Sequence, residues 1–139
     1  MIDKTKDKAL QYYRNAWKTQ DLHEEVYSQD VEFYAPMKVF KGKEVVLAAL
    51  KNWFMLLHDV SEVSYITHGE QAVMLSRLAL NNSGGSIYYL WEYDYFQFNA
   101  NGQIKLYRPI FDSGKATYEL LGFDIAERCA EARKLADRQ

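Results

Sequence analysis

The chain has 139 residues, of which 48% are hydrophobic and 15% aromatic, with only two prolines and seven glycines. This length suits one domain with one core, and the composition excludes a disordered or low-complexity chain. The formal net charge is −2 and no basic face is evident, which argues against nucleic acid as a partner. A single cysteine, no secretory leader and no apolar run near the roughly twenty residues of a membrane span predict a cytoplasmic protein without a transmembrane helix.

The first half of the chain predicts helices and one strand. Residues 4–19 form an amphipathic helix in this prediction, because one face carries Ala9, Leu10, Tyr13, Ala16 and Trp17. A short helical segment opens at Asp21, and residues 31–36 are typical of a strand closed by proline. Residues 43–58 predict a second long helix that is apolar nearly all round.

The second half predicts an antiparallel meander followed by a helix. The strand-like segments are residues 61–68, 71–81, 86–99 and 103–112, with hairpin signals at 82–85 and 99–102. Residues 115–139 are expected to form a C-terminal helical extension, with Asp124 and Glu127 as a capping pair and Cys129 on its apolar stripe. The whole chain is then a single α+β domain, in which a curved antiparallel sheet closes as a cone over three helices. The wide end of a cone is a natural pocket for a small molecule.

Four segments, in order, carry a family resemblance: YYRNAWKTQDL from residue 12, VEFYAP from 31, FKGKEVVLAAL from 40 and WEYDYFQFNANGQIKLYRPIFD from 91. Together they resemble the NTF2-like (cystatin-like) superfamily, in particular its SnoaL-like and ketosteroid-isomerase-like members, over about residues 5–113. In ketosteroid isomerases a helix tyrosine and a protonated aspartic acid donate hydrogen bonds to the substrate oxyanion. The resemblance implies Tyr13 and Asp94 for these two roles.

The same resemblance implies a general base immediately before Pro36, where this chain has Ala35. Moving a proton between carbons needs a group that accepts and returns it within hydrogen-bond reach. Tyr34 is expected on the opposite face of the strand, and Glu32 lies near the start of that strand. The base of the ketosteroid isomerases is therefore missing from its usual position.

Asp94 is either a solvent-facing acid or a buried one. If it is buried, strand alternation predicts which neighbouring side chains share its face. If Asp94 faces the interior, Glu92 does too, and an aromatic row faces outward: Tyr89, Trp91, Tyr93 and Tyr95. A row of this kind is seldom left in water. The C-terminal helix or a second copy of the chain can cover it, and we expect a homodimer through this face, as the resemblance implies.

The remaining site residues follow from these elements. The apolar pocket wall is predicted to comprise Trp17, Tyr34, Leu50, Trp53, Phe54, Tyr107, Pro109 and Phe111, with plain core packing as the alternative for each. Glu92, His58 and Asp112 are further candidate proton carriers; some SnoaL-like cyclases use an acid where Asp112 lies. The histidines lack metal-ligand spacing, so neither a metal nor a cofactor is expected.

Two functions follow. The first is a cofactor-free isomerase, cyclase or dehydratase acting on a small, mostly apolar carbonyl or hydroxyl compound, with Tyr13 and Asp94 polarising its oxygen. The second is a non-catalytic module that uses the same pocket to hold a ligand, or a dimeric interaction module. Ala35, in place of the base, favours the second.

Overall fold

The computed structural model describes residues 4–36, 38–81, 85–112, 116 and 134–136. Its elements are α1 (Lys4–Thr19), the 3₁₀ helix η1 (Glu24–Val26), β1 (Tyr27–Tyr34), β2 (Val39–Lys41), α2 (Lys43–Phe54), β3 (Leu57–His68), β4 (Gln71–Asn81), β5 (Ile87–Phe98) and β6 (Ile104–Ile110). None of the described helices has the length and hydropathy of a membrane span. The predicted extension, residues 115–139, lies outside the described residues except for Ala116 and 134–136, which are helical.

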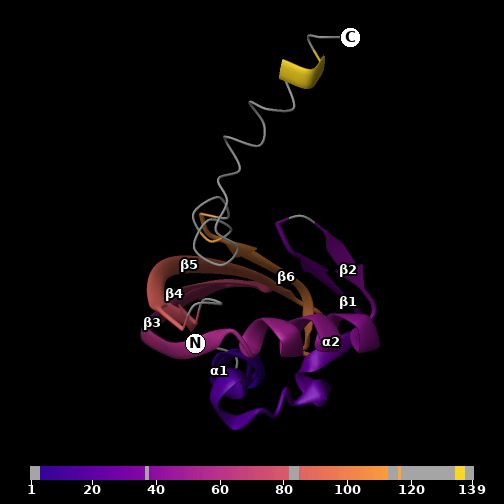
Figure 1. Cartoon of the computed structure of the whole chain (residues 1–139). Coiled ribbons are helices and arrows are strands. Elements are labelled where there is room, and N and C mark those ends of the chain that lie inside the picture. The colour runs from indigo at the N-terminus through magenta and orange to yellow at the C-terminus, as the bar shows by residue number, and fades with distance from the viewer. Residues whose placement is uncertain (1–3, 37, 82–84, 113–115, 117–133, 137–139) are drawn as a thin grey trace.

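The strands form one six-stranded sheet in the order β2-β1-β6-β5-β4-β3. Figure 1 shows this sheet curling over α1 and α2, as the predicted α+β cone requires. The sheet is mixed, because β1 returns beside β6 in a parallel pairing, whereas every other neighbouring pair is antiparallel. That pairing joins distant parts of the sequence, so local patterns did not predict it.

Irregular pairing bends the two outer parts of the sheet. The register of β3 against β4 shifts between Ser61 and Ser64, where Glu62 adopts a φ of 51°. The register of β1 against β6 shifts between Tyr27 and Glu32. Extra residues of this kind bend a strand and increase its twist. The bends let the sheet enclose the helices rather than lie flat on them.

Three predicted boundaries were wrong: the end of the second long helix, the start of β3, which is Leu57 rather than residue 61, and the start of the first strand. The second long helix ends at Phe54 instead of continuing to about His58, because Leu57 already pairs with Leu80 of β4. His58 is therefore an exposed strand residue rather than a helix-terminal one. The first strand begins at Tyr27, earlier than predicted, and the short strand β2 was not predicted at all.

Strand alternation along β5 follows the prediction. Asp94 and Glu92 lie on the buried face, and so do Tyr88, Leu90, Phe96 and Phe98. On the opposite face Tyr89, Trp91 and Tyr93 are 52%, 46% and 50% exposed, and Tyr95 is half-buried. The strand therefore separates an aromatic outer surface from a buried inner surface that carries two acids.

Candidate functional site

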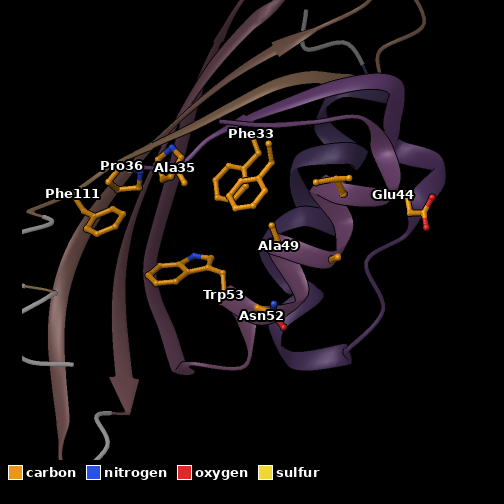
Figure 2. A pocket seen from close by; sticks show the side chains of 12 residues that line it. Phe33, Ala35, Pro36, Glu44, Ala49, Asn52, Trp53 and Phe111 are labelled. Carbon is orange, nitrogen blue, oxygen red and sulfur yellow. The ribbon is translucent and has the colours of Figure 1, made fainter. Parts of the chain in front are cut away.

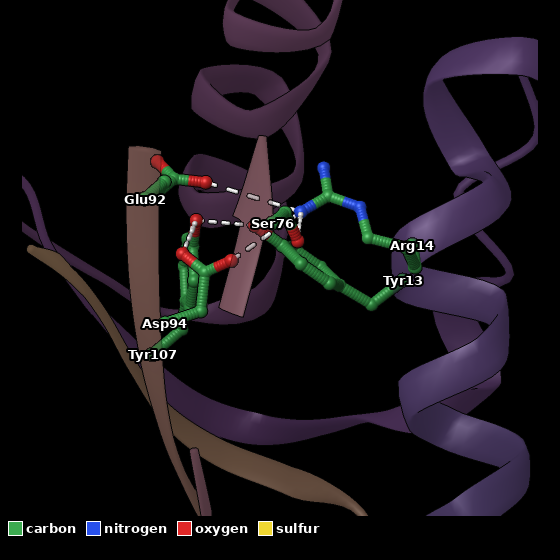
Figure 3. A network of polar contacts seen from close by, with 6 residues as sticks. All are labelled: Tyr13, Arg14, Ser76, Glu92, Asp94 and Tyr107. Carbon is green, nitrogen blue, oxygen red and sulfur yellow. Dashed lines mark hydrogen bonds and ion pairs between the residues drawn. The ribbon is translucent and has the colours of Figure 1, made fainter. Parts of the chain in front are cut away.

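Six polar side chains from four elements meet inside the cone. They are Tyr13 and Arg14 of α1, Ser76 of β4, Glu92 and Asp94 of β5, and Tyr107 of β6, and we call them the polar network (Figure 3). Antiparallel pairing places Ser76 directly opposite Glu92. Glu92 and Asp94 are 0% exposed and Arg14 is 5% exposed. Charged groups are rarely this deeply buried unless they are paired.

A chain of hydrogen bonds runs through the network. Tyr13 donates to the Tyr107 hydroxyl, which in turn donates to Oδ1 of Asp94 at 3.0 Å. Arg14 donates through Nη1 to Oδ2 of Asp94 at 3.4 Å and to Oγ of Ser76 at 3.1 Å. Asp94 thus accepts from two side chains on opposite sides.

Glu92 is bonded less completely than Asp94. Its Oε2 lies 3.9 Å from Nη1 of Arg14, an ion pair without a hydrogen bond. Among the described residues, no donor group gives either of its carboxyl oxygens a hydrogen bond. Nε and Nη2 of Arg14 are buried and likewise have no hydrogen-bond partner within the described part of the chain.

Burial dominates the protonation of the network. It raises the pKa of Asp94 to about 6, while the Arg14 cation and the hydrogen bond from Tyr107 lower it in part. Burial and the negative charge of Asp94 raise the pKa of Glu92 well above its usual range. Burial also raises the pKa of Tyr13 and Tyr107, so both tyrosines keep their protons.

Charge balance leads to the same assignment. Burial lowers the pKa of Arg14, but the surrounding hydroxyls and carboxyls raise it overall, so the guanidinium stays charged. One buried cation compensates one carboxylate, and a second uncompensated charge is costly to bury. Near neutral pH the pair Glu92 and Asp94 therefore holds one proton, mainly on Glu92.

A cavity lined mainly by apolar side chains lies beside this network rather than within it. It has a volume of about 620 Å³ and lies between α2 and the ends of β1, β2 and β6 (Figure 2). Its lining residues are Phe33, Ala35, Pro36, Phe40, Glu44, Val45, Ala48, Ala49, Asn52, Trp53, Pro109 and Phe111. Glu44 is the only charged residue among them, and Asn52 adds an amide. We call this the apolar cavity.

Phe33 connects the apolar cavity to the polar network. It lines the cavity and stacks on Tyr107, with ring centroids 5.0 Å apart. It also stacks on Phe40 at 5.6 Å. No residue of the polar network lines the apolar cavity. The Phe33 ring therefore lies between the apolar cavity and Tyr107, whose hydroxyl donates a hydrogen bond to Asp94.

Arg14 lines a second cavity on another side of the molecule. This cavity has a volume of about 300 Å³ and lies between α1 and β3. Its other lining residues are Asn15, Trp17, Lys18, Asp59, Val60 and Val63. The bend of β3 between Ser61 and Ser64 falls at its edge. We call this the α1–β3 cavity.

The structure brings some of the predicted catalytic residues together and separates others. Tyr13, Asp94 and Glu92 meet in the polar network. His58 and Asp112 are exposed and belong neither to that network nor to the lining of the apolar cavity. The backbone carbonyl of Asp112 accepts a hydrogen bond from the Ala116 N–H at 3.0 Å.

The predicted wall residues are similarly divided. Trp53, Pro109 and Phe111 line the apolar cavity, and the rings of Trp53 and Phe111 stack at 5.8 Å. Tyr34 instead lines a neighbouring depression of about 380 Å³, under the guanidinium of Arg108. The remaining residues lie in the core or line the α1–β3 cavity: Leu50, Phe54 and Tyr107 in the core, and Trp17 at that cavity.

Sequence reasoning missed Arg14, Ser76 and much of the cavity lining. Arg14 could have been inferred, since two buried acids require a buried cation and this residue follows Tyr13 on the apolar side of a helix. Phe33 of β1 lies two residues before Ala35, so strand alternation places both side chains on the face that lines the cavity. The face of α2 that lines the cavity repeats at helical spacing through Val45, Ala49 and Trp53.

Metal ligands are not grouped in the described part of the chain. No cluster of three or more His, Cys, Asp or Glu side chains there could hold a metal ion.

The comparisons with known proteins support the fold. No protein-family model matches the chain. No curated protein matches its sequence either. Among solved structures, an NTF2-like protein of unknown function from Burkholderia pseudomallei matches with a TM-score of 0.72 at 14% identity, covering 85% of this chain and 98% of its own.

Two further structures have named activities or ligands. A steroid delta-isomerase from Pseudomonas aeruginosa matches with a TM-score of 0.70 at 18% identity, over 96% of this chain and 97% of its own. TerC, co-crystallised with polyporic acid, matches with a TM-score of 0.71 at 16% identity, over 86% of this chain and 99% of its own. At these identities the likeness shows the fold alone, and that fold is NTF2-like.

Proposed function

We propose that the protein binds a small, mostly apolar molecule in the apolar cavity. The observation that supports this is the cavity itself, a space of about 620 Å³ lined almost wholly by aliphatic and aromatic side chains. Cavities of a few hundred Å³ with this lining are the usual form of small-molecule sites. Glu44 is the only charged group in the lining, which favours a neutral or cationic ligand over an anion. Of the structural neighbours, TerC was crystallised with a small organic ligand.

Fluorescence titration with N-phenyl-1-naphthylamine, a neutral apolar probe, tests this proposal. Val45 and Val63 are both exposed valines, but Val45 lines the apolar cavity and Val63 lines the α1–β3 cavity. Val45→Trp fills the first space and should weaken probe binding at least about tenfold, whereas Val63→Trp should leave it unchanged. Equal affinity in wild type and Val45→Trp would exclude the apolar cavity as the site.

The second candidate function is a cofactor-free isomerase, cyclase or dehydratase. The observation favouring it is the convergence of Tyr13, Asp94 and Glu92 in one buried network, in which burial raises the pKa of both carboxyls. Tyr13 and Asp94 polarise a substrate oxygen in this candidate. This requires both side chains to exchange their bonds with Tyr107 for bonds to the substrate, and the proton shared by Glu92 and Asp94 to lie on Asp94. One neighbour, a steroid delta-isomerase, has this class of activity.

Binding of 2-naphtholate, a mimic of an enolate, tests this second candidate. Asp94→Asn should weaken 2-naphtholate binding and keep the fold. Equal affinity in wild type and variant would remove Asp94 from the oxyanion site. His58 and Asp112 remain proposed proton carriers only if the substrate reaches the exposed surface where they lie.

For assembly we propose a homodimer through the outer face of β5. Tyr89, Trp91 and Tyr93 are exposed there, and neighbouring strands add Val73 and Ile110. Large exposed aromatic surfaces of this kind are usually covered by a partner. A second copy of the chain brings a matching neutral surface to this face. At the edge of the face, Arg77 lies over the Tyr89 ring at 4.2 Å and adds a polar rim.

A further inference from the structure

The α1–β3 cavity has a wall formed by a cation with unused hydrogen-bond donors. Arg14 lines this cavity, and within the described part of the chain its Nε and Nη2 are buried without a partner. Its Nη1 donates to Ser76 and Asp94, which holds the guanidinium in place. Figure 3 shows one of the other nitrogens pointing away from Ser76 and Asp94. Because most buried polar groups in proteins are satisfied, these donors indicate a missing acceptor.

A second cation shares this wall of the cavity. Lys18 lies four residues after Arg14 on α1 and therefore on the same face of the helix. Arg14 is buried and Lys18 is exposed, so the two cations lie at the inner and outer ends of one wall. A carboxylate has two oxygens and can accept hydrogen bonds from a guanidinium and an ammonium group at the same time. The α1 wall is therefore suited to a carboxylate.

The β3 wall of the cavity carries an acid. Asp59 lines the cavity and is exposed. Among the residues that the structure describes, neither Asp59 nor Lys18 forms an ion pair. The charge of Arg14 is already balanced within the polar network, so Lys18 and Asp59 leave the cavity neutral overall. A ligand with one charge of each sign complements such a cavity.

The rest of the lining is mostly apolar. Trp17 comes from α1, and Val60 and Val63 come from β3, while Asn15 adds one amide. The volume of about 300 Å³ is at the lower end of the range for small-molecule sites. The cavity therefore suits a compact ligand that has an apolar side group besides its two charges.

We propose that the α1–β3 cavity binds a free α-amino acid with an apolar side chain. Arg14 and Lys18 hold its carboxylate. Asp59 holds its ammonium group, and Trp17 packs on its side chain. The terminus of a protein chain fits less well, because it carries only one of the two charges. This site shares no lining residue with the apolar cavity and does not depend on the ligand proposed there.

Isothermal titration calorimetry with L-phenylalanine tests the proposal. Hydrocinnamate has the same ring and carboxylate without the ammonium group, and phenethylamine has the ring and ammonium group without the carboxylate. Each should bind wild type at least about tenfold more weakly than L-phenylalanine, because each leaves one charged wall without its partner. No binding of L-phenylalanine at millimolar concentration, or equal affinity for L-phenylalanine and either analogue, would overturn the site.

Asp59→Asn tests the acid without changing the buried network. Binding of L-phenylalanine should weaken at least about tenfold, whereas hydrocinnamate should bind at least as well as it does to wild type. Asp30→Asn, an exposed acid of β1 outside this cavity, is the matched control and should bind L-phenylalanine like wild type. Equal L-phenylalanine affinity in wild type and Asp59→Asn would overturn the assignment of the ammonium group.

Filling each cavity separately tests the location. Val63→Trp fills the α1–β3 cavity and should abolish L-phenylalanine binding, whereas Val45→Trp fills the apolar cavity and should leave it unchanged. These are the reverse of the effects expected for N-phenyl-1-naphthylamine, so the two sites can fail independently. Loss of L-phenylalanine binding in Val45→Trp, with binding retained in Val63→Trp, would overturn the α1–β3 site.

Discussion

Tyr107 donates a hydrogen bond to Asp94 at 3.0 Å and accepts one from Tyr13. The tyrosine and the acid that the sequence pairs as donors to a substrate are thus joined through a third hydroxyl. Asp94 accepts hydrogen bonds in this arrangement, and the one proton that Glu92 and Asp94 share lies mainly on Glu92. The chemistry of the network then depends on how strongly Tyr107 holds Asp94.

Replacing Tyr107 with Phe measures what its hydrogen bond contributes to the pKa of Asp94 and to stability. The Tyr107 hydrogen bond lowers the pKa of Asp94, so Tyr107→Phe should raise it above about 6. Losing two buried hydrogen bonds should also lower the free energy of unfolding by about 1–3 kcal/mol. NMR titration of carbon-13-labelled aspartate and urea denaturation give the two values. Tyr34→Phe, whose hydroxyl bonds to Glu32 outside the network, is the control; an unchanged Asp94 pKa in Tyr107→Phe would contradict the assignment.

The stability of the protein should fall as the pH rises. Asp94 has a pKa of about 6 in the folded protein against 3.8 ordinarily, and the pKa of Glu92 is also raised. The folded state therefore binds more protons than the unfolded state from about pH 4 up to the folded pKa values, and the free energy of unfolding decreases across that interval. We expect a fall on the order of 2 kcal/mol between pH 5 and 8.

Glu92→Gln isolates the contribution of Glu92 to this pH dependence. Glutamine carries no charge at any pH, so urea denaturation of the variant should show a smaller fall over the same interval. Glu44→Gln, an exposed acid, should retain the wild-type slope. A steeper fall in Glu92→Gln than in wild type would show that Glu92 is not the carboxyl with the raised pKa.

Gly102 tests the contact between the β5–β6 turn and α1. It has a φ of 75°, and an added Cβ would lie 2.7 Å from Cγ2 of Thr5. Gly69 has a φ of 57° with open space around it. Gly69→Ala should therefore cost about 1 kcal/mol from backbone strain alone, and Gly102→Ala about 1–3 kcal/mol more. Equal losses in urea denaturation would mean that Thr5 moves aside freely.

Trp91→Glu tests the proposed dimer. A charge in the middle of the exposed aromatic face should give the mass of one chain, or aggregates, in light scattering, where wild type gives the mass of two. Val45→Glu, an exposed valine on α2 away from this face, is the matched control and should remain dimeric. An unchanged mass for Trp91→Glu would place the interface elsewhere.

Local periodicity was sufficient to predict much of the fold. The alternation of β5 placed Glu92 and Asp94 inside and Trp91 outside, because one buried face fixes the parity of every residue along a strand. Local periodicity failed to predict the end of α2, because the apolar helical pattern continues through Leu57, whereas Leu57 pairs with Leu80 and begins β3. The contacts that decide such points join distant residues.

The site was less predictable than the fold for the same reason. Asp94 and Tyr13 could be identified individually, but Tyr107 joins them only through the packing of α1 against β6. Arg14 carries no sequence signal beyond its place beside Tyr13. The position of the apolar cavity depends on where Phe33 stacks, which no spacing in the sequence specifies.

The structure of a complex with N-phenyl-1-naphthylamine tests the central claim most directly. We predict that the probe lies in the apolar cavity, in contact with Trp53 and Phe33, and leaves the Tyr107–Asp94 hydrogen bond intact. A probe bound on the outer face of β5 at Trp91, with the apolar cavity empty, would contradict it.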